Sequence, residues 1–125
     1  MFKKLFFKQI IGARGEKKAA KYLAGKGYKI VDLNMRTPFG EIDIIASDNT
    51  EQAEAVLVFV EVKTRGSGQF GAGLDAITVN KQRKLIRSAQ YYCKMKDIMP
   101  LCRFDVISID EGEITHVENA FICNG

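Results

Sequence analysis

The chain has 125 residues, of which 46% are hydrophobic and 27% are charged, and its formal net charge is +4. This composition excludes a disordered chain and predicts one globular domain over residues 1–125. No apolar run reaches the roughly 20 residues of a membrane-spanning helix. The small positive charge favours a polyanionic partner.

The cysteines indicate the compartment. Cys93, Cys102 and Cys123 are odd in number and are not spaced as metal-binding or redox pairs. Such cysteines are typical of free thiols in a reducing environment. We therefore expect a cytoplasmic protein.

The first eleven residues form a basic leader. Met1–Ile11 combines three lysines with apolar residues at helical spacing, so as a helix it would be amphipathic. One interpretation is contact with a membrane surface or a partner's groove. The favoured interpretation is a leader that packs a few aromatic side chains on the domain.

The spacing of apolar residues predicts a helix over about 13–26, ended by Gly25 and Gly27. Glu16 lies in its first turns, where the helix N-terminus favours a negative charge in any protein.

A β-hairpin is predicted next. Alternating residues indicate strands over 28–34 and 40–47, with turn residues at 37–40. In the second strand, strict alternation puts Ile42, Ile44 and Ala46 on one face. The other face then carries Glu41, Asp43 and Ile45.

Residues 56–64 form the most distinctive strand. Valines occupy the even positions from 56 to 62, while Leu57, Phe59, Glu61 and Lys63 point the other way. Both faces are apolar until the last residues, which predicts a central strand covered on both sides. Charged side chains are rarely buried alone, so Glu61 and Lys63 need a metal, a ligand or each other.

A glycine-rich segment, residues 66–73, follows and matches no phosphate-binding fingerprint. Thr78 then caps a helix that extends to about Met95. Positive residues fill its first half, where they oppose the helix dipole, so an anionic ligand explains them slightly better than a solvated face does. They are Lys81, Arg83, Lys84 and Arg87.

Two further strands are expected, over residues 101–109 and 114–120, joined by a turn at 110–113. His116 has no histidine or cysteine at ligand spacing, which favours a structural role. The order αβββαββ, with a helix crossing between the third and fourth strands, predicts an α/β fold. Its mixed sheet of about five strands would have helices on its faces.

Asp43, Glu61 and Lys63 are predicted to share a pocket, since they lie on neighbouring strands. Two carboxylates repel each other, and a hard divalent cation, Mg²⁺ or Mn²⁺, would relieve that repulsion. Two alternatives need no ligand: an ion pair between Glu61 and Lys63, or one between Lys63 and Asp43.

The order of these motifs resembles the YraN (UPF0102) family of small predicted endonucleases. The resemblance spans about residues 12–109 and implies a restriction-endonuclease-like core, akin to archaeal Holliday junction resolvases. It implies a metal-dependent nuclease acting on DNA. The motifs are Gly15-Glu16, Asn34, Arg36, Gly40-Glu41-Ile42-Asp43, Phe59-Val60-Glu61-Val62-Lys63-Thr64-Arg65, Phe70-Gly71, Lys81 and Arg103-Phe104-Asp105-Val106.

The resemblance also implies roles for residues. Asp43 and Glu61 would be metal ligands, Lys63 the catalytic lysine, and Glu16 a carboxylate that reaches the metal from a helix. Glu41 would hold a second metal or pair with a basic side chain such as Arg36.

The expected chemistry is metal-assisted hydrolysis of a phosphodiester bond in DNA, with Lys63 orienting or deprotonating the attacking water. The chain shows no recognition helix, which favours structure-selective or nonspecific action on DNA over site-specific cutting. Branched or damaged DNA is a candidate substrate. Resolution of a junction would require a homodimer. Candidate phosphate contacts are Arg36, Arg65, Lys81, Arg83, Lys84 and Arg87.

Two alternatives belong to other classes. One is a DNA-binding accessory protein that keeps the nuclease fold and turns over weakly or not at all. The other is a protein-interaction domain in which Met1–Ile11 docks a partner.

Overall fold

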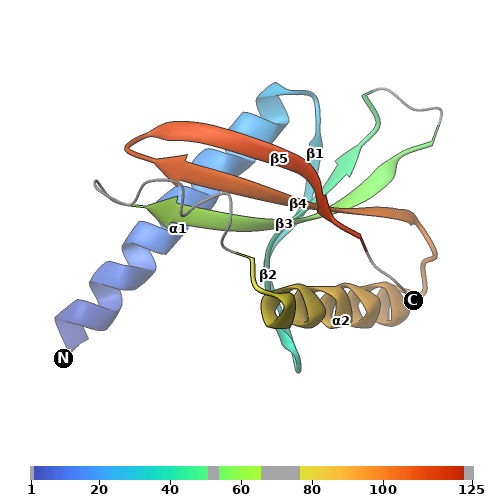
Figure 1. Cartoon of the computed structure of the whole chain (residues 1–125), viewed down its shortest axis with the longest axis horizontal. Helices are drawn as coiled ribbons and strands as arrows, with labels where there is room; N and C mark the ends of the chain where they lie inside the picture. The colour runs from blue at the N-terminus through green and yellow to red at the C-terminus, as the bar shows by residue number, and fades with distance from the viewer. Residues whose placement is uncertain (1, 51–53, 66–76, 123–125) are drawn as a thin grey trace.

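The computed structural model describes residues 2–50, 54–65 and 77–122. Figure 1 shows a twisted sheet with a helix on each side. The elements follow the predicted order αβββαββ and form an α/β fold consistent with a restriction-endonuclease-like core. They are α1 (Phe2–Gly25), β1 (Lys29–Thr37), β2 (Gly40–Asp48), β3 (Val56–Arg65), α2 (Val79–Lys96), β4 (Leu101–Asp110) and β5 (Glu113–Phe121).

The sheet has the order β1-β2-β3-β4-β5, so β3 is central. Neighbouring strands are antiparallel except β3 and β4, which are parallel because α2 carries the chain across between them. Thr78 caps α2 as predicted, and its hydroxyl accepts a hydrogen bond from the Lys81 N–H. The mixed sheet is therefore confirmed.

Strand β3 separates two hydrophobic clusters. Val56, Val58 and Val60 pack with Ala19 and Leu23 of α1. On the opposite face, Phe59 packs with a cluster that includes Leu85, Ala89 and Tyr92 of α2. The alternation predicted for this strand is correct.

Helix α1 is longer than predicted. It begins at Phe2 rather than near Ala13, so most of the Met1–Ile11 leader is part of the helix. No proline interrupts residues 2–25, and glycine at 12 and 15 weakens a helix without ending it. The side chains of residues 1–13 lie outside the described part of the structure.

Strict alternation in β2 is wrong. Ile42 packs with Ile45 on the α2 side, while Ile44 and Ala46 pack on the α1 side. The face changes opposite Asn34 of β1, which has a left-handed backbone with φ of 53°. Pairing between β2 and β3 also begins only at Ile44, so the preceding residues of β2 are paired with β1 alone.

A polar network holds the sheet at the end of β2. Arg103 lies 2.9 Å from both Asp48 and Asp105. His116 Nε2 is 2.7 Å from an Asp105 oxygen. Because the Lys26 ammonium lies 3.2 Å from His116 Nδ1 and can only donate, Nε2 carries the ring proton. The structural role expected for His116 is confirmed.

Among the residues that the structure describes, no helix is long and apolar enough to cross a membrane.

Candidate metal and nucleic-acid site

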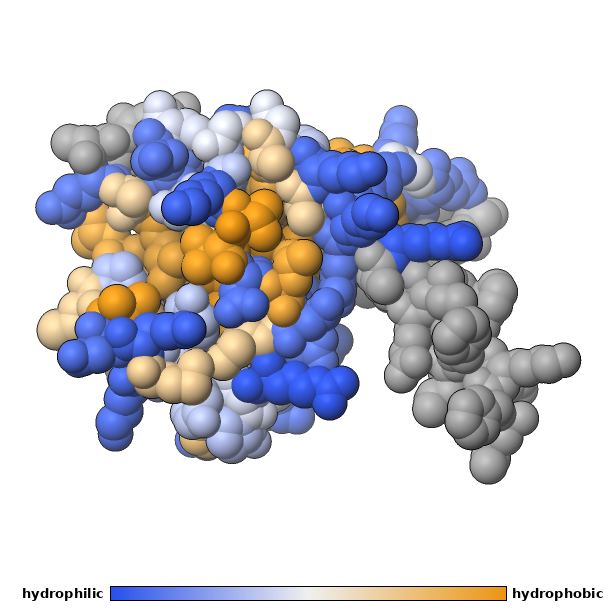
Figure 2. Space-filling view, turned by 180° about the vertical axis from the view of Figure 1, so that it is seen from behind, coloured by the Kyte–Doolittle hydropathy of each residue, from blue (hydrophilic) through white to orange (hydrophobic). Residues whose placement is uncertain are grey.

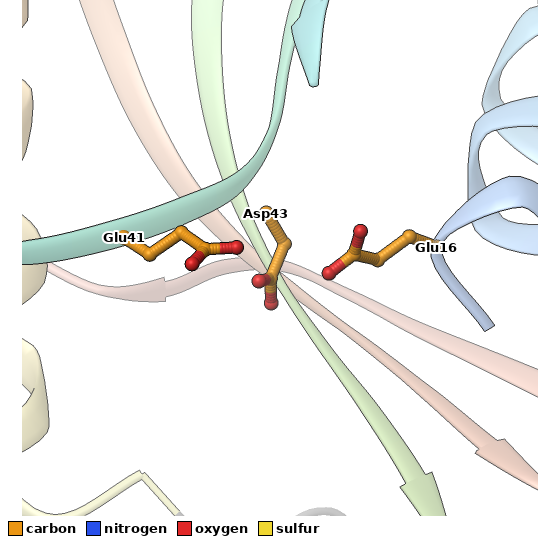
Figure 3. A group of neighbouring side chains, drawn as sticks. All are labelled: Glu16, Glu41 and Asp43. Atoms are coloured by element: carbon orange, nitrogen blue, oxygen red, sulfur yellow. The ribbon is translucent and has the colours of Figure 1, made fainter. Parts of the chain in front are cut away.

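Three carboxylates from separate parts of the fold meet at one point. Glu16 of α1 and Glu41 and Asp43 of β2 each place one carboxylate oxygen within 4.8 Å of the others. Figure 3 shows Asp43 in the middle, with Glu41 and Glu16 reaching toward it from opposite sides. Asp43 therefore lies between Glu16, which comes from α1, and Glu41, which also lines a pocket with residues of α2.

Asp43 is fixed by the backbone of the neighbouring strand. Its Oδ2 accepts a hydrogen bond from the Val62 N–H at 2.8 Å. The ladder between β2 and β3 extends only to Ile44 and Val60, so the carboxylate takes the place of a backbone acceptor. This bond sets where Asp43 points.

Glu16 reaches the site because α1 lies unusually close to β3. A Cβ atom on Gly15 would overlap the hydroxyl of Thr64, so only glycine fits there without a shift. The side-chain amide of Asn34 donates a hydrogen bond to Glu16, and Glu16 is also hydrogen bonded to Asp43.

Burial and mutual repulsion shift the pKa values of these acids. Burial, followed by the negative charge of Asp43, raises the pKa of Glu16 to about 7. The same two causes raise the pKa of Glu61 to about 7. Burial raises the pKa of Asp43 as well, while the Val62 N–H opposes the change. The site therefore concentrates more negative charge than it neutralises, which favours a cation.

Glu61 and Lys63 follow on β3. Glu61 lies outside the three-carboxylate group but shares a pocket of about 150 Å³ with Glu41, Lys81 and Lys84. Lys63 is only 8% exposed and pairs in register with Ser108 of β4. The charge of Asp43 raises the pKa of Glu61, which agrees with the proximity predicted for these two residues.

The predicted phosphate contacts fall into three groups. Lys81 and Lys84 line the pocket beside Glu61. Arg36 is exposed and lies 4.0 Å from Glu41. The other two described cations do not line this pocket: Arg87 stands over the Phe39 ring at 5.8 Å, and Arg83 is exposed to solvent. The Arg65 side chain and the glycine-rich segment lie outside the described residues.

Sequence reasoning gave no role to two residues that build the site. Gly15 and Asn34 appeared only as parts of motifs, although they set the positions of α1 and Glu16. Asparagine tolerates the left-handed backbone better than most residues. This tolerance could have indicated a special backbone conformation at Asn34. The close approach at Gly15 depends on tertiary packing, so no local pattern predicts it.

The donor set suits a hard cation. Within the described residues, the group of possible ligands contains carboxylates alone, with no histidine or cysteine. Oxygen ligands favour Mg²⁺ or Mn²⁺ over Zn²⁺. Glu16, Glu41 and Asp43 therefore fit the cofactor expected from the sequence.

A family model described as "Uncharacterised protein family UPF0102" matches residues 15–109. A UPF0102 protein of Thermodesulfovibrio yellowstonii is 48% identical over 111 residues, which are 89% of this chain and 95% of the relative. A UPF0102 protein of Persephonella marina is 45% identical over 116 residues, or 92% of this chain and 96% of the relative. Neither name specifies an activity.

Proposed function

Because this chain belongs to the UPF0102 family, we propose that it is a metal-dependent endonuclease that hydrolyses phosphodiester bonds in DNA. The convergence of Glu16, Glu41 and Asp43 within 4.8 Å carries the proposal. The raised pKa values of Glu16 and Asp43 indicate that burial and repulsion are not compensated within the protein. Ordinary surface acids avoid both costs by staying apart in water.

Glu16, Glu41 and Asp43 would hold Mg²⁺ or Mn²⁺, with Glu61 next to them. The cation, when bound, supplies positive charge that polarises the phosphodiester and acidifies water. The Val62 N–H keeps one Asp43 oxygen oriented, which leaves the other to bind. Asn34 does the same for Glu16.

Lys63 is the proposed catalytic lysine. It is nearly buried and lies two residues beyond Glu61 on the same face of β3. From there it would orient the attacking water and stabilise the negative charge that develops on phosphorus oxygens.

Lys81 and Lys84 are the proposed phosphate contacts. They flank the pocket that contains Glu41 and Glu61. Their charges would offset the repulsion between the acids and a DNA backbone.

Cys93 and Cys102 form no disulfide, which supports a protein that acts in the reducing cytoplasm.

The test is cleavage of linear, flapped and four-way DNA with Mg²⁺, Mn²⁺ or a chelator. We expect metal-dependent cutting by the wild type, and a loss of at least about 10²-fold in Asp43→Asn and in Lys63→Met. Symmetric cuts in the four-way substrate would indicate a dimer.

Two control variants match these changes in chemistry. Asp97→Asn alters an exposed acid at the far end of α2, whose left-handed backbone suits asparagine. Lys29→Met alters an exposed lysine at the start of β1. Both controls should cut at the wild-type rate. DNA binding without any cutting would instead identify the accessory protein with a nuclease fold.

A further inference from the structure

A groove between α1 and β1 opens beside the carboxylates. Its volume is about 530 Å³, and its walls come from α1 between Glu16 and Ala24 and from β1 between Ile30 and Asn34. We call it the α1–β1 groove. A volume of this size is typical of a small-molecule site and is far larger than a hydrated metal ion needs.

The groove is continuous with the carboxylate site. Glu16 belongs to both, and Asn34, which is hydrogen bonded to Glu16, lines the groove. A molecule held at the carboxylates by one of its groups can therefore extend directly into the groove.

The walls of the groove are apolar. Ala20, Ala24, Ile30 and Leu33 line it, and Leu33 is 46% exposed although it belongs to a strand. Figure 2 shows, on the side turned away in Figure 1, hydrophobic side chains gathered in one area with hydrophilic ones around it. Ala20 and Ala24 are small, so the helix surface there is flat enough for a planar group.

The rim of the groove is positive. Lys17 and Lys21 lie one helical turn apart on α1, and both are exposed. An apolar floor beside two cations matches a nucleotide, whose base has an apolar face and whose backbone is anionic. A lipid chain would fit the floor but would gain nothing from the adjoining carboxylate site.

We propose that the α1–β1 groove binds one unpaired base of the DNA strand whose phosphate lies at the carboxylates. This rests on the proposed nuclease function, because that function sets where the phosphate lies. A base inside a duplex is covered on both faces by its neighbours, so it cannot enter. The groove would therefore select DNA with unpaired nucleotides, such as flaps and single-stranded tails.

The test measures binding rather than cleavage, in Ca²⁺, a hard cation that oxygen ligands also bind, so that the carboxylates do not repel the phosphate. The two probes are a duplex with a short single-stranded tail and the same duplex with abasic residues in that tail. They carry equal charge and differ only in the bases. The wild type should bind the base-bearing tail about tenfold more tightly, the order expected from burying part of a base face.

Ala24→Leu should remove that difference by filling the groove at an exposed helix position. The matched control is Gln90→Leu, which adds the same side chain at an exposed position of α2. Replacing Lys17 and Lys21 with glutamine should weaken binding of both probes equally and reduce the salt dependence.

Equal binding of the two probes by the wild type, or no binding of either, would overturn the proposal. So would a full tenfold preference in Ala24→Leu. If the protein cuts paired DNA but shows no base preference, the proposed nuclease function stands and the proposed role of the α1–β1 groove fails. If the protein shows the base preference but does not cut DNA in Mg²⁺, the groove binds a base and the proposed nuclease function fails.

Discussion

The carboxylates of Glu16, Glu41 and Asp43 destabilise the folded protein when no cation neutralises them. Each repels the others, and burial raises the pKa of both Glu16 and Asp43. The hydrogen bonds from Asn34 and from the Val62 N–H offset only part of that cost. Such a cost is common at binding sites, where the ligand supplies the missing interaction.

Glu16→Gln should therefore stabilise the metal-free protein at neutral pH. The pKa of Glu16 is raised to about 7, against an ordinary value of 4.5 for a glutamate carboxyl. Between these values the folded chain holds a proton that the unfolded chain has released, so stability falls as the pH rises. We expect the melting temperature of the variant to exceed that of the wild type by roughly 2–4 °C at pH 7.5, and to match it at pH 4.5.

Thermal melts in chelator measure this effect, and repeats with Mn²⁺ measure cation binding. Mn²⁺ should raise the melting temperature of the wild type more than that of Glu16→Gln. Glu113→Gln, an exposed change on β5, should behave as the wild type does in both series. A lower melting temperature for Glu16→Gln at pH 7.5 would contradict the repulsion argument.

At the scale of elements, the position of α1 against β3 decides whether Glu16 reaches the site. The contact occurs at Gly15, whose missing side chain leaves room for the Thr64 hydroxyl. At the same end of the molecule, Lys18 donates a hydrogen bond of 2.7 Å to the Gly112 carbonyl in the β4–β5 turn. Helix α1 therefore contacts both β3 and the β4–β5 turn close to Glu16.

Gly15→Ala should impair the site more than it impairs the fold. The new methyl group overlaps the Thr64 hydroxyl, so either the Thr64 side chain rotates or α1 moves away from β3 and carries Glu16 with it, and only the second change impairs the site. Misplacement on the order of 1 Å lowers catalytic rates by about 10²-fold. Cleavage rate and Mn²⁺-induced stabilisation are the measurements.

Two further variants isolate this contact. Gly25→Ala introduces the same methyl group where nothing lies within 4 Å, so its activity should equal that of the wild type. Combining Gly15→Ala with Thr64→Ala removes the overlapping oxygen and should restore most of the activity. Because alanine favours a helix more than glycine does, equal losses in Gly15→Ala and Gly25→Ala would show that the contact with Thr64 is not responsible.

The sequence predicted those elements whose pattern is local. The alternation in β3 and the cap at Thr78 depend on neighbouring residues, so both were correct. The change of face between Ile42 and Ile44 was not predictable from period-2 alternation, since it depends on the left-handed backbone of Asn34 on another strand. Alternation did place Glu41 on the face of Asp43, but the role predicted for it was a second metal or a basic partner, whereas the structure puts it in the central group.

Over the whole molecule, charge is distributed between two regions of the sheet that are built differently. Along β3 and β4, Arg103 pairs in register with Val58, whereas Lys63 pairs with Ser108 farther along. In the first region each charge has a close partner, as in the contacts of Arg103 with Asp48 and Asp105. In the second region, the carboxylates of Glu16, Glu41 and Asp43 lie close to one another. The first region is suited to stability, and the second to binding.

The paired region should control stability toward acid. Hydrogen bonds from Thr50 and Arg103 lower the pKa of Asp48 to about 2 although burial opposes them, and those from His116 and Arg103 similarly lower the pKa of Asp105. A lowered pKa means that the carboxylate contributes its full stability above the ordinary value of 3.8 and loses it as the pH falls toward 2.

Asp48→Asn should consequently cost about 2 kcal/mol at pH 7, where the charged hydrogen bonds to Arg103 and Thr50 are intact. The cost should be smaller at pH 3, because the wild type has by then lost part of the same contribution relative to its unfolded state. Urea denaturation at both pH values measures the difference, with Asp97→Asn as the exposed control. A cost for Asp48→Asn that does not change between pH 7 and pH 3 would mean that its role is packing rather than charge.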